Sequence, residues 1–263
     1  SSLEDEIIAR HLQVADACIA TLGINVDSYI VTDEPLGVVI TNESGISGGY
    51  IENPSVLINA GQKLINKGVT AIAIVSKFPE DIDKSYAVDL YREGKGIDCI
   101  AGVEAVISHL ISKYLKVPCA HAPGLKPLEL NVKLDPRAAA EEIGYTFLSS
   151  VLIGLSHAPD LIDLSNNLDE SISLYPKEIK SIVVPSGALG GEAVLACMER
   201  RLNIIAVKNQ GVLDVDNKKL MYPKTIEVNN YFEAAGILLA AREGINHKSI
   251  KRPLLPFKNS RLL

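Results

Sequence analysis

Two titratable side chains, Glu104 and His121, are the strongest candidates for chemistry in this sequence. Glu104 lies in a predicted helix over 100–115 that is otherwise largely apolar, and a carboxylate buried there is costly unless it is paired. His121 follows a predicted short strand at 117–120, among small residues that leave room for a ligand. We expect His121 to transfer a proton as a general acid or base, and Glu104 to orient it or to share the proton. The alternative is that His121 is a turn histidine bonded to the backbone.

Two neighbours extend this group. His109 follows Glu104 on the same predicted helix and is a further candidate base, although a single helix histidine is more often a structural residue. Cys119 becomes a candidate nucleophile if His121 lowers the pKa of its thiol. Neither residue replaces His121 as the first choice for proton transfer.

A second candidate site is the turn between a predicted strand at 181–185 and the helix that follows it. The turn carries Ser186, Gly187, Gly190 and Gly191, whose backbone N–H groups at a helix N-terminus suit a phosphate or carboxylate. The glycine spacing differs from the dinucleotide fingerprint, and no acidic residue follows the next strand, 203–207, so the pattern argues against NAD. Lys208 follows that strand instead and could pair with an anion. Alternatively, the glycines only permit close packing of helix against sheet.

Three more charged residues belong to predicted loops. Lys95 lies in the glycine-containing loop 91–97 and is a further candidate to hold an anion. Asp33 and Glu34 precede Pro35 in a predicted turn, which suits a cation or a hydroxyl group. The sequence predicts no dedicated metal site. No Cys-X-X-Cys pair is present, and ligands would be available only if the fold brought together His109, His121, Asp33, Glu34 and Glu104. No cofactor is identified from the sequence.

Strands and helices alternate along the chain. This order predicts an α/β fold with mostly parallel sheets, helices on both faces and Rossmann-like βαβ units. Helices are predicted over 3–22, 54–67, 100–115, 136–143 and 229–243. Strands are predicted within 29–41 and over 69–76, 117–120, 147–153, 181–185 and 203–207, with edge strands at 212–215 and 225–228, and 41–49 is predicted to be a loop. A domain boundary is predicted near residue 160. Residues 1–160 would form an α/β half with glycine-rich loops, and residues 161–263 a βαβ half with a basic tail. The alternative is that the two halves form one continuous domain.

Composition narrows the classes of partner. The chain has 263 residues, is 47% hydrophobic and carries a net charge of −6, so its field repels nucleic acids and anionic membranes. No apolar stretch approaches the length of a membrane span. The four cysteines are widely separated, which favours free thiols in a reducing compartment. Composition thus argues against nucleic acid and membrane as partners, and the expected partner is a small anionic ligand, on the evidence of the 186–191 turn and Lys208.

Several stretches together resemble a family of unknown function found mainly in cyanobacteria and photosynthetic eukaryotes. The stretches that carry the resemblance are 10–17, 32–37, 96–109, 118–123, 140–148 and 184–191. The resemblance implies a bacterial-type cytoplasmic setting or the plastid stroma, and it implies no activity. Family members are longer at the N-terminus, with a glycine-rich segment before Arg10. We therefore expect a homo-oligomer, or association with a polypeptide that supplies this segment.

Taken together, the sequence favours an enzyme that acts on a small anionic metabolite by proton transfer, as a lyase, isomerase or hydrolase. Two alternatives stay open. The same pocket could belong to a non-catalytic ligand-binding or regulatory module, which a ligand would stabilise without turnover. The chain could also be a structural subunit of a larger assembly.

Overall fold

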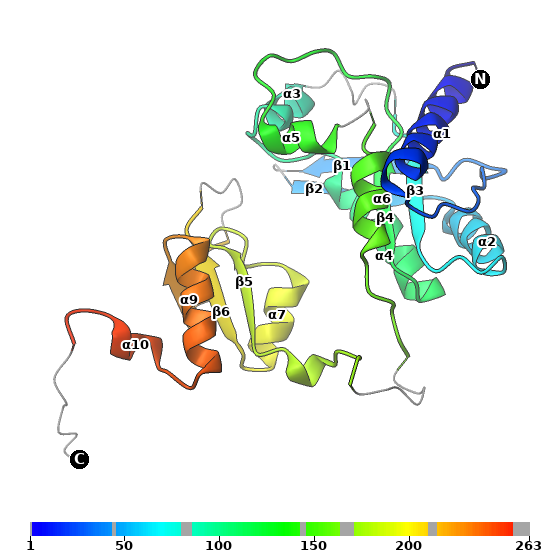
Figure 1. The fold of residues 1–263 in the computed structure, drawn as a ribbon. Coiled ribbons are helices and arrows are strands. Elements are labelled where there is room, and N and C mark those ends of the chain that lie inside the picture. Colours follow the sequence, from blue (N-terminus) through cyan, green and yellow to red (C-terminus); the bar gives the residue numbers. More distant parts are fainter. Residues whose placement is uncertain are drawn as a thin grey trace. The chain divides into compact units, whose positions relative to one another are not determined.

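A computed structural model confirms the α/β fold class (Figure 1). The structure describes residues 2–43, 46–79, 86–142, 146–163, 171–209 and 215–254. The chain divides into two compact units, Ser1–Asn167 and Leu168–Leu263.

A two-stranded parallel sheet forms the centre of the first unit. Its strands are β3 (Ile72–Ser76) and β4 (Cys119–Pro123). Side chains alternate between the faces of β3, so Ile72 and Ile74 pack against α2 (Pro54–Ile65) and α4 (Ala101–Leu115). Ala73 packs on the other face, against α1 (Ser2–Leu22) and α6 (Leu148–Ser156). Helices therefore cover both faces of this sheet.

An antiparallel hairpin packs on α4. It consists of β1 (Val38–Glu43) and β2 (Ile46–Ile51). The contact is close because glycines remove the side chains from it: a Cβ at Gly102 would lie 2.4 Å from the backbone oxygen of Ser47. The hairpin corrects two predictions, since most of 41–49 is strand rather than loop and 29–32 has no strand partner among the described residues.

Two short helices, α3 (Tyr86–Arg92) and α5 (Pro136–Glu141), complete the first unit. As predicted, α5 begins with an Asp135 cap, whose side chain accepts a hydrogen bond from the backbone N–H of Arg137. The buried guanidinium of Arg92 forms an ion pair with Glu142 at 2.9 Å. This pair ties the end of α3 to the residue after α5.

The second unit contains a three-stranded parallel sheet in the order β5–β6–β7 (Ser181–Pro185, Asn203–Val207, Thr225–Val228). On β6, Ile204 and Ala206 face α7 (Glu192–Glu199), whereas Ile205 and Val207 face α9 (Tyr231–Arg242). The two helices thus lie on opposite faces of the sheet (Figure 1). The remaining elements are η2 (Pro176–Glu178), α8 (Asn217–Leu220) and α10 (His247–Ile250).

Three further predictions of secondary structure were wrong or shifted. The apolar run 147–153 is helix α6 and not a strand, because its apolar residues Leu148 and Leu152 lie one helical turn apart and fill a core with Cys18. His121 lies inside β4 rather than after it. Residues 91–92 end helix α3 instead of opening a loop. Of the predicted edge strand at 212–215, only Val215 lies within the described residues, where it forms an isolated bridge with Ala188.

Candidate functional site

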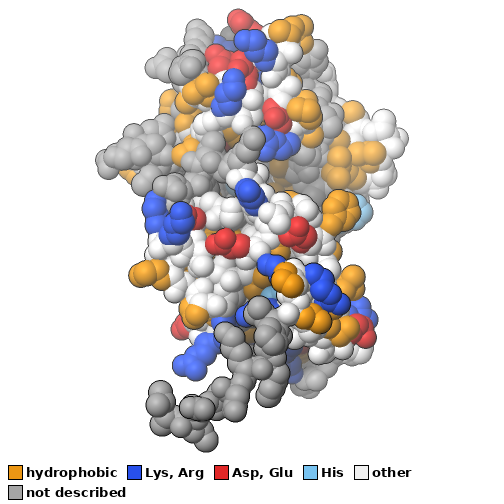
Figure 2. Space-filling model, turned by 90° about the vertical axis from the view of Figure 1, so that its left-hand side faces the viewer, with side chains coloured by type: hydrophobic (Ala, Val, Ile, Leu, Met, Phe, Trp, Pro, Cys, Tyr) orange, Lys and Arg blue, Asp and Glu red, His pale blue; other side chains and the backbone are white. Residues whose placement is uncertain are grey.

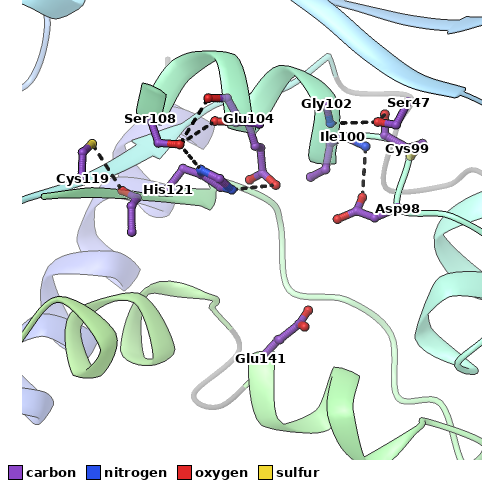
Figure 3. Close-up of polar contacts among 12 residues, drawn as sticks. Ser47, Asp98, Cys99, Ile100, Gly102, Glu104, Ser108, Cys119, His121 and Glu141 are labelled. Atoms are coloured by element: carbon purple, nitrogen blue, oxygen red, sulfur yellow. Dashed lines mark hydrogen bonds and ion pairs between the residues drawn. The ribbon is translucent and has the colours of Figure 1, made fainter. Parts of the chain in front are cut away.

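The candidate site lies where α4 packs against β4. Glu104 and Ser108 are one turn apart and therefore share a face of α4. His121 pairs in register with Ile74 and directs its ring toward that face (Figure 3). Its Nδ1 lies 2.9 Å from Ser108 Oγ, and its Nε2 lies 3.6 Å from Glu104 Oε2.

The contacts of Ser108 favour one tautomer of His121. The Ser108 hydroxyl donates to the backbone carbonyl of Glu104 at 3.2 Å, so its oxygen is left to accept a hydrogen bond. On this basis we assign the hydrogen to His121 Nδ1, as the donor in the 2.9 Å contact. In the neutral ring, Nε2 is consequently a free base that faces the Glu104 carboxyl.

Glu104 is buried, with only 5% of its surface exposed. Burial raises its pKa to about 8, and the carboxylates of Asp98 and Glu141 act in the same direction. Among the described residues, Glu104 Oε1 has no hydrogen-bond partner, which adds to the cost of ionising the group. Glu104 is therefore mainly a neutral carboxylic acid at pH 7.

His121 is more accessible, with a side chain that is 30% exposed. Burial lowers its pKa, and the nearby His109 lowers it further. The shifts of the two residues have the same consequence, because both favour the uncharged forms of His121 and Glu104. Near neutral pH the site thus holds a base and an acid side by side, an arrangement found in enzymes that catalyse proton transfer.

The N-terminus of α4 is held by groups from two neighbouring segments (Figure 3). Ser47 of β2 accepts a hydrogen bond from the N–H of Gly102 at 2.9 Å and donates to the carbonyl of Cys99 at 3.0 Å. Asp98 accepts from the N–H of Ile100 at 3.0 Å. These bonds fix the first turn of the helix and with it the position of Glu104.

Two neighbours of the site have raised pKa values. Tyr91 donates a 2.8 Å hydrogen bond to Glu141, and burial together with that carboxylate raises the pKa of its phenol. Burial also raises the pKa of the Cys119 thiol to about 12. Cys119 is therefore a thiol at neutral pH, which does not favour its predicted role as a nucleophile.

The other predicted residues of the first unit lie outside the His121–Glu104 contact. His109 is exposed on α4, and Lys95 forms an exposed ion pair with Glu93 at 3.1 Å. Asp33 and Glu34 are exposed in the segment between α1 and β1, where Lys63 lies 3.6 Å from Asp33. Of the predicted catalytic residues, the structure brings together His121 and Glu104, with Ser108 between ring and helix.

The predicted anion-binding residues Ser186, Gly187, Gly190, Gly191 and Lys208 belong to the second unit. Within their turn, the N–H groups of Ser186, Ala188 and Leu189 already donate to backbone carbonyls, and the N–H of Lys208 donates to Val228. Gly191 caps α7, and Glu192 supplies a carboxylate in its first turn. Fewer donors therefore face a ligand than the sequence suggested.

The described residues contain neither a cluster of potential metal ligands nor a membrane-spanning helix. No group of three or more potential metal ligands occurs in the parts of the chain that the structure describes. Over the same residues, no helix is both long and apolar enough to cross a membrane. Acidic and basic side chains are interspersed on the face that Figure 2 shows. The four cysteines are free thiols.

Sequence reasoning missed three contributors to the site. The first is Ser47, which binds the N–H of Gly102. The others are Asp98 and Glu141, whose charges raise the pKa of Glu104. Only the Gly48-Gly49 pair hinted that β2 would approach another backbone closely.

Comparison with known proteins identified a cyanobacterial relative and a protein family that match this chain. It is 41% identical over 248 residues to an uncharacterized lipoprotein of Synechococcus sp. (strain ATCC 27144 / PCC 6301 / SAUG 1402/1), a match that covers 94% of this chain and 68% of the relative. No solved structure shows significant similarity. Residues 1–251 match the family described as "protein of unknown function (DUF3326)". Over nearly its whole length, therefore, this chain belongs to the DUF3326 family, as the sequence resemblance predicted.

Proposed function

We propose that the first unit catalyses proton transfer on a small carbonyl compound, with His121 as the base and Glu104 as the acid. The observation that carries the proposal is the 3.6 Å separation of His121 Nε2 and Glu104 Oε2. This separation is too long for a good direct hydrogen bond, yet it allows the two atoms to contact neighbouring atoms of one substrate.

The expected step is abstraction of a proton next to a carbonyl group. His121 Nε2 takes the proton from carbon, while Glu104 gives its own proton to the carbonyl oxygen, so that an enol forms. The neutral pair becomes an imidazolium and a carboxylate, and the reverse transfer restores it. Ser108 accepts from Nδ1–H throughout and so holds the ring in place.

The nearby charges bear on the substrate class. Asp98 and Glu141 are the groups whose charges raise the pKa of Glu104. Additional negative charge is therefore disfavoured beside it, and an uncharged carbonyl fits better than a carboxylate. Several N–H donors of the 186–191 turn are already bonded to backbone carbonyls, which leaves fewer of them to hold an anion.

Deuterium incorporation into a panel of carbonyl compounds tests the proposal. Small aldehydes, ketones, hydroxyketones and 2-oxo acids are incubated with the protein in D2O, and loss of the proton next to the carbonyl is followed by NMR. We expect exchange of at least one compound, slowed about 100-fold or more by His121→Ala, because a positioned acid or base contributes about that much. His247→Ala, a histidine of the second unit, is the matched control and should exchange at the wild-type rate. Exchange that persists in His121→Ala, or its absence with every compound, would contradict the assignment.

A further inference from the structure

One edge of strand β3 is unpaired among the residues that the structure describes. It pairs with β4, where the N–H of Ile72 donates to Pro118 and the N–H of Gly124 donates to Ser76. Backbone groups alternate along a strand, so those of Ala73 and Val75 point to the opposite edge. Within the described residues, neither has a backbone hydrogen-bond partner. An exposed edge of this kind is a template for pairing with another strand.

A groove of about 1930 Å³ runs along this edge. Every residue of 68–79 lines one side of the groove, and every residue of 22–38 lines the other. Only alternate residues of a strand would line a space above a sheet face, so the groove borders the edges of these two segments. Apolar residues of α2 close it on one face of the sheet, and apolar residues of α1 and α6 close it on the other. The groove thus continues the layer of the β3–β4 sheet between its two helical layers. Its volume exceeds that of ordinary small-molecule pockets, about 300–1,000 Å³.

Three buried polar atoms border the groove without a partner among the described residues. They are His11 Nε2, Ser28 Oγ and Ser76 Oγ. The Nδ1 of His11 lies 2.7 Å from the carbonyl of Ile7 and donates to it, so in the neutral ring Nε2 is an acceptor. Polar as well as apolar residues therefore line the groove, and a polypeptide offers both kinds of group to such a lining, whereas a hydrocarbon chain does not.

The segment on the far side of the groove has the composition of a strand without a partner. Residues 29–32, Tyr-Ile-Val-Thr, are of types enriched in strands, yet they pair with no other segment within the described chain. A strand placed in the groove would lie between them and β3. Such a strand would explain why this stretch is strand-like in composition but unpaired.

We propose that the groove receives one additional β-strand, supplied by polypeptide outside these 263 residues, which pairs with Ala73 and Val75 of β3. The Synechococcus relative shows where such a strand could come from, because about a third of its length lies outside the match. This proposal is independent of the proton-transfer function, since it rests on a different edge and different side chains.

Hydrogen exchange read by mass spectrometry tests the proposal. The probe is the part of the Synechococcus relative outside the match, produced as a separate polypeptide and added to this chain. We expect exchange in 71–76 and 28–32 to slow by about 10-fold or more, because edge amides become bonded. Val75→Pro should abolish this protection by removing the edge N–H, whereas Val75→Ala should keep it.

Several outcomes would overturn the proposal. They are no binding, protection confined to other segments, and protection that survives Val75→Pro. If concentrating this chain without the added polypeptide gave the same protection, the groove would bind a second copy of the chain, and the proposal would also be overturned. If Val75→Pro does not fold, the site of protection in the wild-type chain decides.

Discussion

Replacing Glu104 with glutamine is expected to stabilise the first unit strongly at alkaline pH and hardly at all at acidic pH. The folded state raises the pKa of Glu104 from 4.5 to about 8. Below pH 4.5 the carboxyl is protonated in both the folded and unfolded states, so the two proteins should be equally stable. Between pH 4.5 and 8 the unfolded chain ionises first, and the wild type loses stability as pH rises.

The expected gain of Glu104→Gln at pH 9 is of the order of 5 kcal/mol, as about 1.4 kcal/mol accompanies each pKa unit. The difference in unfolding free energy is measured by urea unfolding at about pH 4 and about pH 9. Hydrogen exchange of peptides from α4 reports the unfolding of the first unit. Glu199→Gln, on an exposed residue of α7, is the control and should stay within about 0.5 kcal/mol at both pH values. A gain of equal size at both pH values would show that Glu104 is not held neutral.

Replacing Gly102 with alanine is expected to destabilise the first unit by about 3 kcal/mol. A Cβ at this position would lie 2.4 Å from the backbone oxygen of Ser47 and 2.7 Å from Cα of Gly48. Backbone atoms cannot turn aside as a flexible side chain does, so α4 or the β1–β2 hairpin must move. Movement of α4 would also displace Glu104 from His121, and deuterium incorporation should fall with stability.

Gly154→Ala provides a matched control. Gly154 also lies in a helix, α6, but a Cβ there would meet no atom within 4 Å. This substitution should stabilise the protein by about 0.5 kcal/mol, because it lowers the conformational entropy of the unfolded chain. Thermal unfolding of both variants checks the contrast, and similar effects in the two would refute the tight contact at Gly102.

The sequence was most informative where a local pattern decides the structure. The helix at 101–115, the parallel strands at 181–185 and 203–207, and the Asp135 cap follow from apolar periodicity and capping residues. The strand predicted at 147–153 failed because a short apolar run fits a buried helix equally well. The hairpin was missed because Gly48 and Gly49 suggest a loop, whereas in the structure Gly49 allows a close approach to Val103 of α4.

The candidate site was partly predictable, because local sequence patterns indicated two of its residues. A carboxylate on the apolar face of α4 signals an unusual environment, and His121 was recognised from its small neighbours. What one sequence could not supply were the separations across elements: Ser108 to the His121 ring, Ser47 to Gly102, and the charges of Asp98 and Glu141 near Glu104. These separations depend on which strands and helices pack against one another.

The central claim is that His121 and Glu104 form a neutral base–acid pair near neutral pH. An NMR titration of the His121 ring, in the wild type and in Glu104→Gln, tests it most directly. We predict hydrogen on Nδ1, a His121 pKa below 6.5, and a second inflection near pH 8 that is absent from Glu104→Gln. A single titration at or above pH 6.5, identical in both proteins, would contradict the account.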